Sequence, residues 1–373
     1  MPLNLRDLDL PGLIAALAGY GIDDAKAGRV FAAVQREGVA DVGGMDWLSL
    51  PIRQALAADV FFPDLKIVER RQAADGFVKY LFRLADGGLI EAVRIPLPDP
   101  ADARSLKQQR QRGEATGLVA LPTAKYTLCI SSQVGCSLGC AFCATGRLRP
   151  ASGVRNLATW EMLAQVRAIA AEADHPVRGI LFLGMGEPLL NYDNVIRTAC
   201  ILSHPAGPAI SGDAVSISTV GVAPAIRRFA AEGHRFRLII SLAAANPQAR
   251  RALMPAEKTW PLDDVMAAVR EYAATCGGRV TFSYVGISGV NMGRAHAAEL
   301  ASLLTGLRAK VTLIGVNDDT GRYLPPSEDE VNEFRTELLA HKIPVARRYA
   351  GGRDIGAACG TLAATQSGGA VLG

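Results

Sequence analysis

From Pro122 onward the chain alternates between short apolar runs and longer segments with helical spacing of apolar residues, and this alternation constrains the fold more than any other feature. Short runs suit buried strands and longer stretches suit helices. Six strand–helix pairs are predicted: 126–131 with 159–173, 179–184 with 192–203, 214–219 with 222–232, 237–242 with 262–276, 280–285 with 294–307, and 311–315 with 328–341. The repeated units favour an α/β fold whose parallel strands form a partial (β/α)6 barrel.

The residues before this region are predicted to form accessory elements. Apolar residues at helical spacing up to about Leu65 predict a small helical domain over residues 1–75. Two strand-like runs, 77–84 and 89–95, flank Ala-Asp-Gly-Gly and predict a β-hairpin at the start of a linker over residues 76–122. The stretch 96–122 carries four prolines and many polar residues, so we expect an exposed loop there. Residues 123–373 would then hold the barrel and a C-terminal loop.

Size, composition and charge exclude several classes of protein. A chain of 373 residues that is 49% hydrophobic can bury a sizeable core. We expect a cytoplasmic protein without a membrane anchor, because no apolar run is long enough to span a bilayer and the N-terminus lacks a secretory signal pattern. Seven cysteines, three of them between positions 136 and 143, indicate metal ligation or catalysis rather than a disulfide framework. The net charge of +4 permits a polyanionic partner without identifying one.

Cys136, Cys140 and Cys143 follow the first predicted barrel strand. Their spacing can place three thiolates around one face of a [4Fe–4S] cluster and leave the fourth iron open. That iron can bind the amino and carboxylate groups of S-adenosylmethionine (SAM), and the cluster can deliver the electron that releases a 5′-deoxyadenosyl radical. Buried structural cysteines and a zinc site are the alternatives, but a zinc site usually pairs two Cys-x-x-Cys units and the sequence has no second unit. The pattern therefore favours a radical SAM enzyme.

Other residues at the ends of predicted strands are candidates for binding SAM. The glycines of the segment 184–188 (GMGEP) allow a close approach of the backbone, and Glu187 can hold an ammonium group, although such a segment can also be an ordinary turn. Ser218, Ser241 and Asn317 fall at or just beyond strand ends, where barrel enzymes place their sites. Serines at these positions are also common as simple caps.

Together these motifs resemble the radical SAM adenine methyltransferases of 23S ribosomal RNA and the related enzyme that methylates carbon 8. The segments that carry the resemblance are 91–96 (EAVRIP), 129–136 (CISSQVGC), 184–191 (GMGEPLLN), 216–219 (SIST), 240–242 (ISL), 296–297 (HA) and 354–360 (DIGAACG). The resemblance implies methylation of an sp2 carbon of adenine, with carbon 2 preferred, and two SAM molecules per turnover. It also implies a set of SAM contacts: Gly186, Glu187, Ser218, Ser241, Leu242, Ala243 and Asn317.

The resemblance further implies roles for two cysteines outside the cluster motif. Cys359 would accept a methyl group from one SAM, and the radical from a second SAM would take a hydrogen from that methyl, leaving a carbon radical that adds to adenine. Cys129 would help to remove the base proton and would release the product by forming a disulfide with Cys359. Glu91 matches a family carboxylate proposed as a proton acceptor, and it could otherwise be an exposed hairpin residue. An external electron donor such as flavodoxin would be required.

Several positions depart from the family pattern. Ala243 stands where the pattern has histidine, Met292 where it has aspartate, and the pair 256–257 (AE) where it has an apolar residue and asparagine. These departures keep two enzymatic hypotheses open: methylation of ribosomal or transfer RNA, and methylation of a free adenine nucleotide or a specialised small molecule. An iron–sulfur sensor is a third, but a sensor would need neither Cys129 nor Cys359.

An RNA substrate would be held through phosphate contacts by clustered basic residues. The candidates are Arg104, Lys107, Arg110, Arg112, Arg347, Arg348 and Arg353, and such residues can also form a merely solvated surface. Cys200 and Cys276 lie on predicted helices among apolar residues, so we expect both to be small buried side chains.

Overall fold

The computed structural model describes residues 2–99, 101–102, 122–148, 150, 153–348 and 351–363. Four of the predicted phosphate contacts, Arg104, Lys107, Arg110 and Arg112, lie outside the described residues. Three others, Arg347, Arg348 and Arg353, lie within them. Among the described residues, no helix has both the length and the apolar character needed to cross a membrane.

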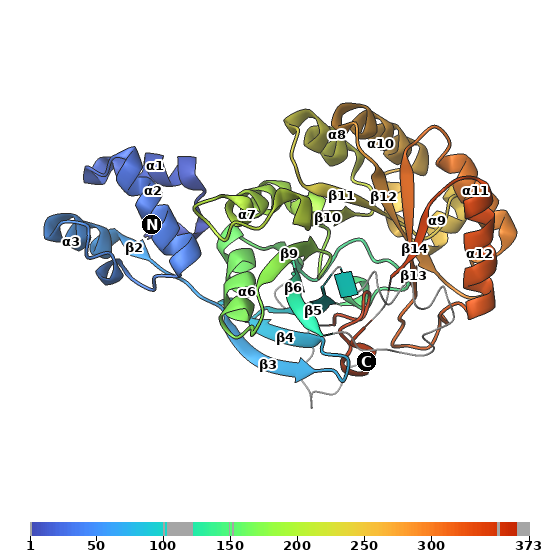
Figure 1. The fold of residues 1–373 in the computed structure, drawn as a ribbon, viewed down its shortest axis with the longest axis horizontal. Coiled ribbons are helices and arrows are strands. Elements are labelled where there is room, and N and C mark those ends of the chain that lie inside the picture. The colour runs from blue at the N-terminus through green and yellow to red at the C-terminus, as the bar shows by residue number, and fades with distance from the viewer. Residues whose placement is uncertain are drawn as a thin grey trace.

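A mixed sheet of ten strands forms the centre of the molecule (Figure 1). Its strand order is β14-β13-β12-β11-β10-β9-β6-β5-β4-β3, so the sheet is open, with β14 and β3 at its edges. Neighbours from β6 to β14 are parallel, and those from β3 to β6 are antiparallel. The strands are β3 (Lys66–Gln72), β4 (Val78–Arg83), β5 (Leu89–Pro98), β6 (Thr123–Cys129), β9 (Val177–Phe182), β10 (Val215–Thr219), β11 (Arg237–Leu242), β12 (Val280–Gly286), β13 (Ala309–Gly315) and β14 (Val345–Arg347).

The six predicted strand–helix pairs are all present, which confirms the α/β class. Their helices are α6 (Thr159–Ala171), α7 (Tyr192–Ser203), α8 (Ala223–Glu232), α10 (Leu262–Cys276), α11 (Arg294–Leu303) and α12 (Glu328–Ala340). They lie along the outer side of the parallel strands (Figure 1). Strand β14 and the short helix α9 (Pro247–Leu253) are among the elements that the sequence pattern does not predict.

Helix α8 illustrates how the sequence determines these bounds. Pro224 lies in the first turn, where a missing N–H leaves no hydrogen bond unmade. Ala223, Ile226 and Phe229 recur at helical spacing and are the buried residues of the helix. Gly233 then ends the helix with a φ of 65°, a left-handed conformation that glycine adopts without strain.

The N-terminal residues form a separate lobe beside α6 and α7 (Figure 1). It consists of the helices α1 (Leu10–Leu17), α2 (Asp24–Ala32) and α3 (Leu50–Asp59) and the paired strands β1 (Leu3–Asn4) and β2 (Val60–Phe61). Strand β3 lies within the range predicted to be helical, and its charged, half-exposed sequence KIVERRQ gives no strand alternation to detect. Strand β5 runs to Pro98 instead of stopping at Ile95, because Pro96 and Pro98 still pair with β6. The three-domain division stays a prediction.

The expectation that Cys200 and Cys276 are buried is wrong, because both are exposed. In α7, Val195, Ile196 and Ala199 are buried, whereas Cys200, at the margin of this buried face, is exposed. Cys276 is the last residue of α10, where the helix leaves the core. An apolar neighbourhood in sequence therefore did not identify the buried face at these positions.

Candidate active site

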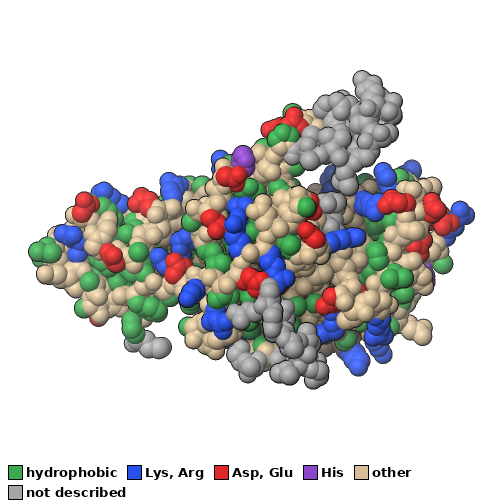
Figure 2. Space-filling view, turned by 90° about the horizontal axis from the view of Figure 1, so that it is seen from below, with side chains coloured by type: hydrophobic (Ala, Val, Ile, Leu, Met, Phe, Trp, Pro, Cys, Tyr) green, Lys and Arg blue, Asp and Glu red, His purple; other side chains and the backbone are tan. Residues whose placement is uncertain are grey.

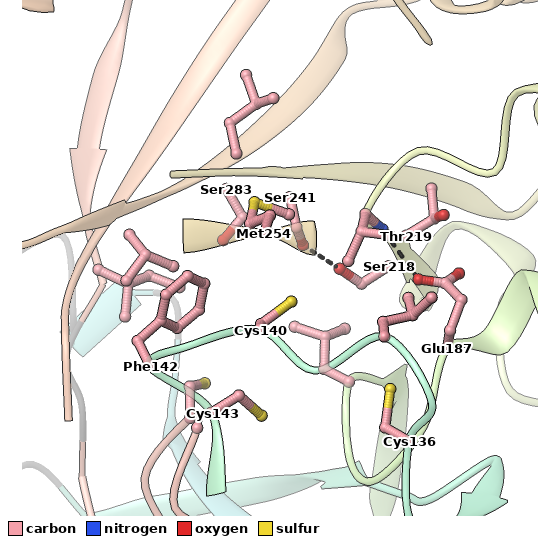
Figure 3. A pocket seen from close by; sticks show the side chains of 18 of the residues that line it. Cys136, Cys140, Phe142, Cys143, Glu187, Ser218, Thr219, Ser241, Met254 and Ser283 are labelled. Carbon is pink, nitrogen blue, oxygen red and sulfur yellow. Dashed lines mark hydrogen bonds between the residues drawn. The ribbon is translucent and has the colours of Figure 1, made fainter. Parts of the chain in front are cut away.

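The carboxyl ends of the parallel strands surround one cavity, called here the main cavity (Figure 3). Parallel strands end at the same edge of a sheet, so residues from distant parts of the sequence meet there. Ten predicted site residues line the cavity: Cys136, Cys140, Cys143, Gly186, Glu187, Ser218, Ser241, Leu242, Asn317 and Cys359. The three predicted cluster ligands and six of the seven predicted SAM contacts, all but Ala243, therefore share a single cavity.

The three cysteines lie on the loop that follows β6 and are half-buried. Burial raises the pKa of the Cys136 thiol to about 11. Burial, reinforced by the charges of Cys143 and Cys136, also raises the pKa of the Cys140 thiol. Three thiolates in such surroundings need a positively charged partner, which an iron–sulfur cluster supplies. Among the described residues, no three Cys, His, Asp or Glu side chains converge on one metal ion.

Glu187 provides a buried carboxylate at the main cavity (Figure 3). Its Oε1 accepts a hydrogen bond from the Leu189 N–H at 3.0 Å, and its Oε2 accepts one from the Val220 N–H at 2.9 Å. Burial raises the pKa of Glu187 to about 7 despite these bonds. No described Lys, Arg or His forms an ion pair with it. The side chain thus fits the positively charged amino group of SAM.

We expect Glu187→Gln to weaken SAM binding by about ten- to a hundredfold, because a hydrogen bond to a charged group contributes about 1.5–3 kcal/mol. Gln keeps the size of the side chain and one oxygen acceptor but not the negative charge. Equilibrium dialysis against radiolabelled SAM measures the effect. Glu271→Gln, at an exposed position on α10, is the matched control and should bind SAM normally. Unchanged affinity in Glu187→Gln would contradict the assignment.

The remaining predicted SAM contacts divide into two groups. Ser218 and Ser241 lie side by side on β10 and β11, with their Oγ atoms 2.9 Å apart, and both face the cavity (Figure 3). Ala243, in contrast, is not among the lining residues. It is fully buried in a small apolar cluster with Met254 and Val316, which do line the cavity. Its place in the structure is behind the cavity wall.

Sequence reasoning missed several residues that line the main cavity. They are Leu138, Phe142, Thr219, Val220, Met254, Ser283, Val285 and Val316, among others. Thr219, the last residue of β10, follows the same strand-end rule that identified Ser218, so the sequence held a signal for it. Ser283 lies in the middle of β12, where that rule does not apply. Met254 had no signal, because it is carried by the unpredicted segment after α9.

Cys129 and Cys359 line a second cavity, called here the cysteine cavity. Cys143, Leu183, Gly184, Cys359 and Gly360 line both cavities, so the two adjoin each other. Burial raises the pKa of the Cys129 thiol to about 12, the charge of Cys359 adds to this rise, and Arg348 opposes it. Cys359 thus stands between the main cavity and Cys129, as a residue that acts with both would require.

The C-terminal loop that carries Cys359 is fixed to two parts of the structure. The Gly360 carbonyl accepts a hydrogen bond from the Ala144 N–H at 2.8 Å, beside the cluster motif. On the hairpin side, the Ala363 N–H donates to Glu91 Oε2 at 3.0 Å. Glu91 is buried and pairs with Lys79 Nζ at 3.0 Å, so the interpretation of Glu91 as an exposed hairpin residue is wrong. Glu91 lines neither cavity, and its role as a proton acceptor stays a prediction.

We expect Lys79→Met to destabilise the fold by about 3–5 kcal/mol, because it leaves the Glu91 carboxylate buried without its cation. Urea denaturation measures the loss. The double variant Lys79→Met/Glu91→Gln should recover part of it, since both charges are then absent. Lys26→Met removes an exposed lysine and should change stability little. Equal losses in the Lys79→Met variant and the Lys26→Met control would contradict the expectation.

Comparison with known proteins supports this site. The model of the radical SAM superfamily matches residues 130–301. A Myxococcus xanthus protein named probable RNA methyltransferase is 48% identical, over 99% of this chain and 97% of its own length. A Syntrophotalea carbinolica protein named dual-specificity RNA methyltransferase RlmN is 37% identical, over 96% of this chain and 89% of its own. The crystal structure of a radical SAM methyltransferase from Sphaerobacter thermophilus is 37% identical with a TM-score of 0.83, and the match covers 98% of this chain and 100% of that one.

The fold, the three cysteines and the superfamily match define a radical SAM enzyme, whose cofactors are a [4Fe–4S] cluster and SAM. The sequence identities to the two named relatives extend over nearly the whole length of this chain, and they show its family. The chain belongs to the RlmN-type family of radical SAM methyltransferases.

Proposed function

We propose that this protein methylates carbon 2 of an adenosine in ribosomal or transfer RNA, with Cys359 as the methyl carrier. The observation that carries the proposal is the position of Cys359, which lines both the main cavity and the cavity that holds Cys129. The names of the relatives, RNA methyltransferases that match nearly the whole chain, support an RNA substrate. The resemblance of the motifs to the carbon 2 enzymes supports the choice of carbon.

Residues of the main cavity hold the cofactors in this proposal. Cys136, Cys140 and Cys143 bind the cluster, and Glu187 holds the amino group of SAM. When bound, the cluster and SAM supply a 5′-deoxyadenosyl radical, and the cluster can also accept the electron that the substrate later releases. Apolar side chains such as Phe142 and Met254 limit the access of water to this chemistry.

Cys359 and Cys129 carry the methyl group and release the product. The Cys359 sulfur takes a methyl group from SAM, and this methyl then loses one hydrogen atom and adds to carbon 2 through its radical. The adduct next loses one electron and the carbon 2 proton. The Cys129 sulfur then attacks the Cys359 sulfur, so that a disulfide forms, the carbon–sulfur bond breaks and the methyl carbon takes a proton from solvent. A radical route suits carbon 2 because this carbon has no lone pair with which to attack SAM.

Mass analysis of nucleosides tests the proposal. The reconstituted enzyme is incubated with SAM, reductant and either a 23S ribosomal RNA fragment, a transfer RNA or free adenosine nucleotides. We expect 2-methyladenosine in RNA digests, identified by comparison with synthetic standards. Methylation of free nucleotides without methylation of RNA would contradict the RNA substrate. The appearance of 8-methyladenosine instead would contradict the choice of carbon 2.

A further inference from the structure

A cleft of about 850 Å³ lies next to the C-terminal loop, on the outer side of β13 and β14. Its walls are formed by the end of β13, the segment that leads into α12, the turn before β4 and the residues around Arg353. Three arginines line it: Arg347, Arg348 and Arg353. We call it the arginine cleft. Its volume is in the range that binds small molecules or a few groups of a larger one.

Each of the three acidic side chains of the arginine cleft has a partner within the protein. Glu328 pairs with Arg347 at 2.6 Å. Asp75 Oδ2 accepts a hydrogen bond from the Gly352 N–H at 2.9 Å, and Asp354 Oδ2 accepts one from the Ala74 N–H at 3.4 Å. Neither Arg348 nor Arg353 has an ion pair or a side-chain hydrogen bond with any residue in the described part of the chain. Within the described residues, these two guanidinium groups are therefore left without an anionic partner.

Arg348 also lines the cysteine cavity, so the arginine cleft adjoins the cavity that holds Cys129 and Cys359. A base whose carbon reacts at Cys359 must have its own sugar and phosphates within a few ångströms of this cavity. Arginine binds phosphate oxygens through paired N–H groups. Figure 2 shows further Lys and Arg side chains over the middle and right of the face seen from below, interleaved with acidic ones.

We propose that the arginine cleft binds the phosphodiester backbone beside the target adenosine, with Arg348 and Arg353 contacting the phosphates. This inference rests on the proposed RNA substrate and adds the path of the strand: the base enters the cysteine cavity and its neighbouring phosphates lie in the cleft. Phosphate contacts of this kind position the substrate without reading its sequence.

Binding of a fluorescent 23S ribosomal RNA fragment across a salt series tests the cleft. Removing one phosphate-binding cation lowers the slope of log affinity against log salt by about 0.7–0.9. We therefore expect a drop of about that size in Arg353→Gln and about twice that in Arg348→Gln/Arg353→Gln. Arg353→Lys keeps the charge and should keep the slope. Arg353→Gln alone suffices if Arg348, beside Cys129, proves necessary for folding.

The matched control is Arg279→Gln/Arg308→Gln, which removes the same charge at the amino ends of the parallel strands, just before β12 and β13. It should keep the slope and the methylation activity of the wild type. If the slope is unchanged in the cleft variants, or if it falls equally in the control, the proposal that the arginine cleft binds phosphates is overturned while the proposed function stays intact. Wild-type protein that neither binds nor methylates RNA would instead overturn the proposed function, and the cleft proposal with it.

Discussion

Replacing Cys359 with alanine is expected to abolish methyl transfer, with a loss of turnover of at least about 10³-fold, because a covalent carrier cannot be bypassed by its neighbours. Cys359 lines both cavities, and no other cysteine of the described chain does so except Cys143 of the cluster motif. Product formation is measured by nucleoside mass analysis. Peptide mass analysis of the wild type should also find a methyl group on Cys359.

Two variants serve as references for this result. Cys276→Ala removes an exposed cysteine on α10 and should keep full activity. In the Cys129→Ala variant, the reaction should stop after the adduct has formed, because no second cysteine can release the product. The RNA then remains covalently attached to Cys359, and the protein–RNA adduct is seen as a shifted band on a denaturing gel. Turnover by Cys359→Ala, or an unmodified Cys359 in an active wild-type preparation, would rule out the methyl-cysteine route.

Single replacement of Cys136, Cys140 or Cys143 with alanine is expected to abolish both the stable cluster and the release of 5′-deoxyadenosine. Each thiolate holds a different iron, so the loss of any one leaves an iron of the cube without its protein ligand. Iron and sulfide content and the visible absorbance of the anaerobically reconstituted protein measure the first effect. Chromatography of 5′-deoxyadenosine in the absence of RNA measures the second.

The exposed cysteines again supply the control. Cys200 is exposed on α7, so the Cys200→Ala variant should load iron as the wild type does. Full iron content in any one of the three cluster variants would contradict the assignment of its cysteine.

Much of the fold could be predicted because its elements are long and strongly patterned. The observed bounds of α7, α10 and β11 agree with the predicted ones to the residue. The main cavity was also predictable in outline, since parallel strands bring the residues at their carboxyl ends together. Ser218 and Ser241, for example, are far apart in sequence and form a side-chain contact across β10 and β11.

The rest depended on contacts that leave no local pattern. The hydrogen bond from Ala363 to Glu91 joins residues 272 positions apart, and its donor is a backbone N–H that any residue other than proline would provide. No spacing rule could show that Glu91 is buried beneath the C-terminal loop. Ala243 lies one residue beyond β11, where the alternation of side chains ends and its direction depends on the packing of Met254.

The fate of deuterium from SAM with a CD₃ methyl group tests the central claim most directly. If the methyl carbon passes through Cys359 and loses a hydrogen atom to the 5′-deoxyadenosyl radical, one deuterium leaves with 5′-deoxyadenosine and the third hydrogen of the product comes from solvent. Mass spectrometry should therefore find 5′-deoxyadenosine with one deuterium and 2-methyladenosine with two. A product methyl group that keeps all three deuterium atoms would contradict the account, because it would show direct transfer from SAM to the base.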